Sequence, residues 1–218
     1  MSWKNDQVSK KETGKIVDFA KRCLNIEGDF VEMGCYKGDT SLVLAEILKE
    51  YNMGKDVEKY VENPVEKMSK SMGKHVERCA SGKIKKQLWI YDSFEGLPDK
   101  SLADESVLGV DFKAGELFVT KREVKDRFLR AGLKVPIIKK GWFSELKTND
   151  LPETVAFAFL DGDFYESIRD SLELVGSKMN KNGILVVHDY TNPALPGVRK
   201  AVDEWTQKNS VDFILEIC

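Results

Sequence analysis

The chain has 218 residues, of which 42% are hydrophobic, and its 34 basic residues nearly balance its 36 acidic ones, for a formal net charge of −2. This length and apolar content are enough to bury the core of one large domain, so we expect a single domain over residues 1–218. The near-neutral charge creates no global positive field for nucleic acid or an anionic membrane surface, which leaves a small molecule as the simpler partner.

Two absences from the sequence bear on where the protein works. The first fifteen residues, MSWKNDQVSKKETGK, lack the apolar core of a signal peptide, and no window approaches the roughly 18 apolar residues of a membrane span. The cysteines Cys23, Cys35, Cys79 and Cys218 are scattered, without the close pairing of a zinc site or the density of a disulfide framework. We therefore expect a cytoplasmic protein with reduced thiols.

Six short apolar blocks are predicted to be strands. They are rich in β-branched or aromatic residues and almost continuously apolar, as strands covered on both faces should be, and they span 29–34, 87–92, 135–141, 155–163, 183–189 and 212–217. Helical spacing of apolar residues occurs near 13–25, 40–53, 121–131, 166–179 and 197–208. Because strands and helices alternate, the sequence predicts an α/β protein with a mainly parallel sheet.

Residues 54–86 interrupt this alternation. Charged residues dominate the segment, and its apolar residues are spaced loosely like an amphipathic helix that Pro64 interrupts. We expect a surface insertion, which is either a lid or dimer arm or simply a solvated charged helix.

The segment FVEMGCYKGDTSL joins the first strand to a helix through Gly34 and Gly38. In a parallel α/β sheet this junction faces the crevice where ligands bind, and glycine lets the backbone approach a ligand closely. A helix cap is expected at Asp39 or Thr40. A dinucleotide-binding loop needs a third glycine, and its absence argues against a nicotinamide dehydrogenase. A tight turn without any ligand would also explain the two glycines.

Asp92 ends the second strand in LWIYDSFEGLP. Its carboxylate can accept two hydrogen bonds from a ribose diol. An acid at the end of the strand beside the glycine loop is the geometry of adenosine binding.

Six blocks of the sequence, VEMGCYKGDTS, YDSFEGLP, KKGWFSEL, LDGDFYESI, HDY and GVRKAVDEW, together carry a family resemblance. They occur in the order and approximate spacing of the S-adenosylmethionine-dependent O-methyltransferases of the macrocin methyltransferase type, which act on sugar hydroxyls of macrolides and aminocoumarins. The resemblance covers roughly residues 28–206. It implies a Rossmann-like class I methyltransferase fold, with a mainly parallel central sheet flanked by helices.

The resemblance also implies S-adenosylmethionine as the cofactor. The positions that match its binding wall are Glu32, Gly34, Tyr36, Asp92, Ser93, Phe94, Gly141, Trp142, Phe143 and Asp161. Among them, Asp92 would accept the ribose hydroxyls. The segment 141–143 resembles the adenine and sulfonium side, although a Trp-Phe pair also occurs as plain core packing.

Asp161 and Asp163 follow the fourth apolar block, in FLDGDFYES. Side chains two apart on an extended segment face the same way, so both carboxylates can point into one crevice. Like charges this close are unfavourable without a cation or a shared proton, which is a reason to expect a metal. An Asp-Gly-Asp turn held by its own backbone bonds is the alternative.

The next strand ends at His188 and Asp189, so Asp161, His188 and Asp189 can converge on one divalent ion. Oxygen ligands favour magnesium. The family typically has Asp-Asp where this chain has His-Asp, and imidazole is a poor magnesium ligand. His188 would therefore shift the site toward manganese or another transition ion, stay outside the coordination, act as a base, or be an ordinary hydrogen-bonded core residue.

The resemblance assigns Asp163 as the general base that takes the proton from the acceptor hydroxyl, while a metal bound to neighbouring hydroxyls would lower that hydroxyl's pKa. The expected activity is metal-assisted O-methylation of a sugar hydroxyl in a glycan or glycosylated metabolite. The alternatives are methylation of a catechol or other small molecule, and a cofactor-binding module without catalysis.

The last apolar block stands alone, where methyltransferases of this fold commonly carry a terminal antiparallel pair. One sheet edge would then be incomplete or completed by a second subunit, and we expect a homodimer.

Overall fold

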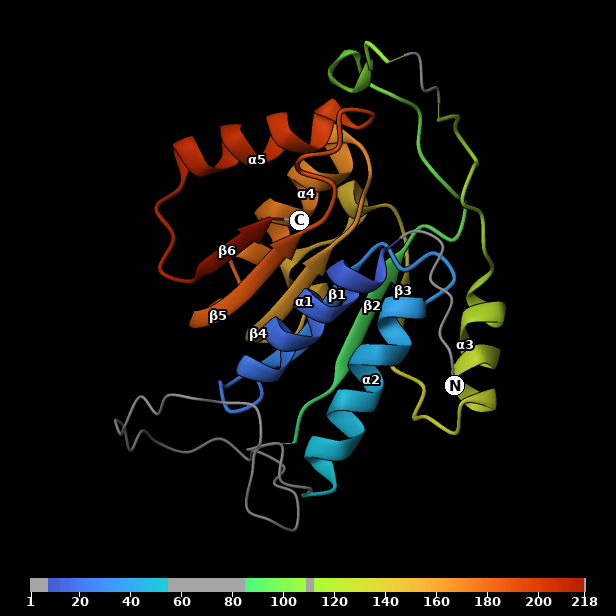
Figure 1. Ribbon diagram of the computed structural model, residues 1–218, viewed down its shortest axis with the longest axis vertical. Coiled ribbons are helices and arrows are strands. Elements are labelled where there is room, and N and C mark those ends of the chain that lie inside the picture. The colour runs from blue at the N-terminus through green and yellow to red at the C-terminus, as the bar shows by residue number, and fades with distance from the viewer. Residues whose placement is uncertain (1–7, 55–84, 109–111, 218) are drawn as a thin grey trace.

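The computed structural model describes residues 8–54, 85–108 and 112–217, and its centre is a six-stranded sheet (Figure 1). The strands are β1 (Asp29–Met33), β2 (Leu88–Asp92), β3 (Ile137–Lys140), β4 (Val155–Leu160), β5 (Met179–Val187) and β6 (Ile214–Ile217). They lie in the order β3-β2-β1-β4-β5-β6, and every neighbouring pair is parallel. The chain order reverses between β1 and β4, which is where open α/β sheets bind their ligands.

Helices cover both faces of this sheet (Figure 1). The α-helices are α1 (Lys10–Arg22), α2 (Asp39–Asn52), α3 (Lys121–Arg130), α4 (Tyr165–Gly176) and α5 (Pro196–Lys208), and short 3-10 helices span Leu102–Asp104, Phe143–Glu145 and Thr148–Asp150. One core packs α1, α2 and α3 against the sheet, and the other packs α4 and α5. In β4, which is buried along its whole length, Phe157 and Phe159 enter the first core, whereas Ala158 and Leu160 enter the second. The α/β prediction is confirmed.

Three local expectations were wrong. Helix α2 is preceded by Gly38 in the left-handed conformation, with no side-chain cap, so neither Asp39 nor Thr40 caps it. Strand β4 ends at Leu160 rather than at residue 163, because Asp163 takes a φ of +60° that no strand allows. Strand β5 begins at Met179 rather than at 183: Met179 pairs with Val155 of β4, and the register then shifts before Ile184 pairs with Phe157.

Some expectations concern parts of the chain that the structure does not describe. The charged insertion lies outside the described residues over 55–84, as do Cys79 and Cys218, whereas Cys23 and Cys35 are buried free thiols. The homodimer stays a prediction. In the described part of the chain, no helix is both long enough and apolar enough to cross a membrane.

Candidate functional site

A cavity opens at the carboxyl ends of the central strands and encloses about 900 Å³ including its open mouth. Twelve of the thirteen residues predicted for the site line it: Glu32, Gly34, Tyr36, Asp92, Ser93, Gly141, Trp142, Phe143, Asp161, Asp163, His188 and Asp189. Phe94 is the exception, because its side chain is buried in the first core. The topology thus brings together positions that are far apart in the sequence.

The glycine loop is held by its neighbours on two sides. Gly34 has a φ of +85°, and a Cβ built on it would overlap the carbonyl oxygen of Asp161, so the close backbone approach here is to the end of β4. Glycine had been expected at this point so that the loop could approach a ligand. Beyond it, Arg127 of α3 donates hydrogen bonds to the carbonyl oxygen of Lys37 and to Asp39.

Asp92 joins this loop to β2. Its Oδ2 accepts hydrogen bonds from the backbone N–H groups of Cys35, at 2.8 Å, and Tyr36, at 3.3 Å, and its Oδ1 accepts one from Phe94 at 2.8 Å. A carboxylate has about four acceptor sites, so roughly one remains for a ligand facing the cavity. The residue predicted to bind ribose therefore also fixes the shape of the loop.

Glu32 lies at the floor of the cavity and is fully buried. The Ser41 hydroxyl donates to its Oε2. Burial raises the pKa of Glu32 well above its usual range, and the nearby charges of Asp161 and Asp92 act in the same direction. A carboxyl in this environment is held partly in its neutral form at the pH where an ordinary glutamate is ionised.

Sequence reasoning missed an apolar part of the cavity wall, formed by Leu97, Pro98 and Leu117. Two backbone hydrogen bonds fold the segment back on itself, from Leu97 N–H to the Glu116 carbonyl at 2.8 Å and from Gly115 N–H to the Leu97 carbonyl at 2.9 Å. No local sequence pattern predicts that the segment at Leu97 contacts the segment at Gly115 and Glu116. The remaining lining residues that were not predicted are Val8, Cys35, Lys37, Asp39, Thr40, Gly96, Gly162 and Ser167.

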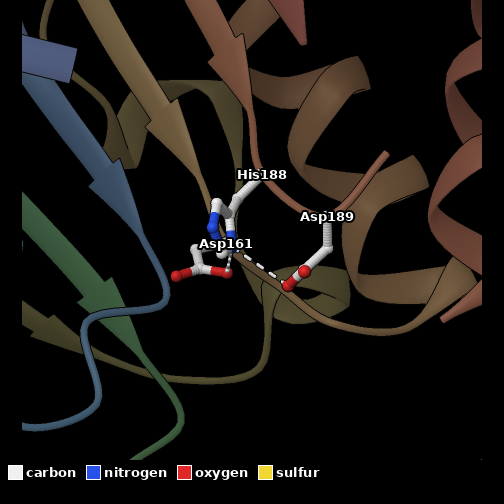
Figure 2. A group of neighbouring side chains, drawn as sticks. All are labelled: Asp161, His188 and Asp189. Carbon is white, nitrogen blue, oxygen red and sulfur yellow. Dashed lines mark hydrogen bonds and ion pairs between the residues drawn. The ribbon is translucent and has the colours of Figure 1, made fainter. Parts of the chain in front are cut away.

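The opposite wall is acidic and surrounds His188. The Nδ1 of His188 lies 3.1 Å from Asp161 Oδ1 and 3.0 Å from Asp189 Oδ2, as Figure 2 shows. Its Nε2 lies 3.9 Å from Glu12 Oε2 in the first turn of α1. The predicted convergence of Asp161, His188 and Asp189 is thus confirmed as an arrangement of side chains, whose ligand atoms lie within 4.8 Å of one another.

At this wall, burial and the neighbouring charges shift the pKa values of His188 and Asp189 in opposite directions. Burial favours neutral imidazole, but hydrogen bonds to Asp161 and Asp189 and the charges of both raise the pKa of His188 to about 12. Burial likewise opposes ionisation of Asp189, yet hydrogen bonding to His188 and the imidazole's charge lower the pKa of Asp189. The two groups stabilise each other's charged form.

Asp163 sits beyond this pair on a strained turn. Its φ of +60° is unusual for a residue with a side chain, and the turn continues into Phe164 and α4. The first backbone N–H of α4, from Tyr165, donates at 2.7 Å to Asp104, a buried residue that sequence reasoning missed. Burial raises the pKa of Asp163 well above its usual range, and the charges of Asp161 and Asp189 add to that rise.

Known proteins resemble this chain in sequence and in fold. It is 26% identical over 199 residues to the 8-demethyl-8-(2,3-dimethoxy-alpha-L-rhamnosyl)-tetracenomycin-C 4'-O-methyltransferase of Streptomyces olivaceus. It is 25% identical over 189 residues to the demethyldecarbamoylnovobiocin O-methyltransferase of Streptomyces niveus. These alignments cover 88% and 84% of the chain, which spans 63% and 60% of the length of those relatives.

Solved structures of methyltransferases are similar to this chain in fold. The O-methyltransferase NovP matches with a TM-score of 0.69 and 25% identity, over 91% of this chain and 72% of its own. A calicheamicin methyltransferase, at 19% identity and a TM-score of 0.60, over 90% of this chain and 72% of its own, supports the fold alone. The family model for macrocin-O-methyltransferase (TylF) matches residues 78–217, more than half of the chain. The chain belongs to the macrocin-O-methyltransferase family.

Proposed function

We propose that this protein transfers a methyl group from S-adenosylmethionine to a hydroxyl group of a sugar, carried by a small molecule or a glycan. The name of one Streptomyces relative supports this class of acceptor, since it specifies a rhamnosyl group on tetracenomycin; that of the other specifies O-methylation of demethyldecarbamoylnovobiocin. The family supports the reaction type.

One observation carries the proposal: the glycine loop with Asp92 and the acidic turn with Asp163 line the same cavity. Asp92 has an acceptor site to spare for a ribose hydroxyl, and the apolar segment Leu97–Pro98 and Trp142 offer surface to an adenine ring. These residues fit the cofactor that the family uses.

Asp163 is suited to take the proton from the acceptor. A sugar hydroxyl is weakly acidic, so a base near it must have a raised pKa to compete for its proton at neutral pH. Burial and the neighbouring carboxylates raise the pKa of Asp163 in that direction. When bound, S-adenosylmethionine would supply a methyl group on a positively charged sulfur, and the walls of the cavity would hold the acceptor oxygen in line with it.

The expected divalent ion fits the described donors poorly. Magnesium prefers oxygen ligands, and one of the three candidate ligand atoms is an imidazole nitrogen. That nitrogen already lies at hydrogen-bonding distance from both carboxylates. We therefore propose the reaction without a step through an ion.

The test combines binding with turnover. Calorimetry should show S-adenosylhomocysteine binding and no NAD binding, and labelled S-adenosylmethionine should methylate deoxysugar glycosides in preference to catechols. Turnover on catechols alone would reject the sugar acceptor. Cofactor binding with no transfer to any hydroxyl in the panel, unchanged by Asp163→Asn, would point to a binding module.

A further inference from the structure

The acidic wall concentrates negative charge around one imidazole. Asp161, Asp163 and Asp189 line the cavity together, and Glu12 lies just behind His188. Lys37 is the only other basic residue among the described residues that line the cavity, and its Nζ lies over the ring of Tyr36, 4.9 Å from the centroid. A group of carboxylates this close requires a cation or shared protons.

The hydrogen bonds around His188 suit a donor rather than a metal ligand. Nδ1 lies 3.1 Å from Asp161 Oδ1 and 3.0 Å from Asp189 Oδ2 (Figure 2), and carboxylate oxygens can only accept unless they are protonated. A nitrogen that donates its N–H to these oxygens has no lone pair to give an ion. The distances are those of ordinary N–H···O bonds.

Two further contacts weigh against an ion at this point. Asp189 Oδ1 accepts a hydrogen bond from the Asn192 amide at 2.9 Å, so both oxygens of Asp189 already have donors in the chain. A metal-bound histidine usually donates its second ring N–H to a carboxylate or carbonyl. The carboxylate that Nε2 faces, on Glu12, is 3.9 Å away, which is beyond hydrogen-bonding distance.

We propose that His188 is the built-in cation of this site: its imidazolium bridges Asp161 and Asp189 and takes the place of a divalent ion. The side chain is 5% exposed and packs against Phe159, with ring centroids 5.9 Å apart, so it is held in position without help from solvent. The cation therefore remains in place whether or not metal is available.

One consequence concerns the acceptor, and this consequence rests on the proposed function. An ion that chelates the substrate needs two neighbouring hydroxyl groups, whereas a fixed imidazolium needs none. The enzyme should then methylate a sugar hydroxyl whose neighbours are deoxygenated or already methylated.

Metal binding tests the inference without any need for activity. Calorimetric titration of the full chain with Mg²⁺ and with Mn²⁺ at pH 7 should show no saturable binding at millimolar concentrations. His188→Asp removes the cation and leaves three carboxylates, at positions 161, 188 and 189, whose ligand atoms are all oxygen. This variant should bind Mn²⁺ at least about tenfold more tightly than the wild type. Asp212→Asn, an exposed position away from the cavity, is the control and should behave like the wild type.

Nuclear magnetic resonance gives a second reading that does not depend on the folding of His188→Asp. The chain has two histidines, His75 and His188, so His75→Gln leaves one imidazole to observe by its ring nitrogens. Both nitrogens should carry protons, and millimolar Mg²⁺ should leave their signals unmoved.

Several results would overturn the inference. One is binding of a divalent ion by the wild type that Asp161→Asn abolishes; another is an unprotonated Nδ1, or an Nδ1 signal that shifts with one equivalent of metal. These results are independent of the proposed activity, because a chain that fails to bind S-adenosylhomocysteine can still show an imidazolium at His188.

Discussion

The two sides of the cavity are held by different kinds of bond. On the side proposed for the cofactor, backbone N–H groups of the glycine loop converge on Asp92, and Gly34 fits against the end of β4 because it has no side chain. On the acidic side, the contacts join side chains, with His188 between Asp161 and Asp189. Changes on the first side should therefore alter stability and cofactor affinity, whereas changes on the second should alter turnover.

Asp163→Asn should have the largest effect. The asparagine amide cannot take the proton from the sugar hydroxyl group, so turnover should fall by about 10²–10⁴-fold, the usual contribution of a general base. Affinity for S-adenosylhomocysteine, measured by calorimetry, should stay within about twofold, because the change removes a role expected only during the reaction. Asp212→Asn is the matched control. An equal fall in affinity would erase the distinction between the two sides.

The pH dependence of the same enzyme sharpens this point. Asp163 must be ionised to act as a base, and its pKa is raised above the usual aspartate range. The rate kcat/KM should therefore rise with pH along a limb that lies well above pH 4, and Asp163→Asn should abolish that limb. A rate that is already maximal at pH 5 would remove Asp163 from this role.

Gly34→Ala should be the most damaging change to stability. Its Cβ would overlap the Asp161 carbonyl oxygen, and the φ of +85° is strained for any residue with a side chain. We expect the free energy of unfolding in urea to fall by about 3 kcal/mol or more. Gly14→Ala is the control, because Gly14 lies in α1 with nothing within 4 Å of its added Cβ; it should gain up to about 1 kcal/mol.

Asp92→Asn should weaken cofactor binding by about tenfold to a hundredfold, since one of two acceptor oxygens becomes a donor that faces backbone N–H groups. Calorimetry with S-adenosylhomocysteine measures this loss. Turnover at saturating cofactor should change much less. A variant that binds normally but turns over slowly would contradict the assignment of Asp92 to the cofactor side.

The sequence predicted the fold better than it predicted the details of the site. Continuous apolar runs such as VAFAFL mark a strand buried on both faces, and parallel strands bring their carboxyl ends together, so Asp92, Asp161 and Asp189 were found at one cavity. Asp163 was expected to face the same way as Asp161 on one extended segment. This premise was wrong because β4 ends three residues before Asp163, although Asp163 still lines the cavity. Backbone conformations of this kind depend on tertiary contacts.

Other features had no local signal at all. Asp104 supports the start of α4 from a segment 61 residues away, and the wall at Leu97 and Leu117 depends on two backbone hydrogen bonds across a loop. Phe94 was expected at the adenosine but is buried in the core, with only its backbone N–H on Asp92. Its neighbours in sequence gave no indication of which way the ring would point.

Arg127→Gln should weaken cofactor binding less than Asp92→Asn does. Arg127 reaches from α3 to the Lys37 carbonyl and to Asp39, but its side chain is 30% exposed, and Asp92 holds the same loop independently. Partly exposed ion pairs contribute about 1 kcal/mol or less, so affinity for S-adenosylhomocysteine should fall by no more than about fivefold. Arg122→Gln, on the same helix with a side chain that is 90% exposed, should change nothing measurable. A loss at Arg127 as large as that at Asp92 would mean that the loop is held from α3 rather than from β2.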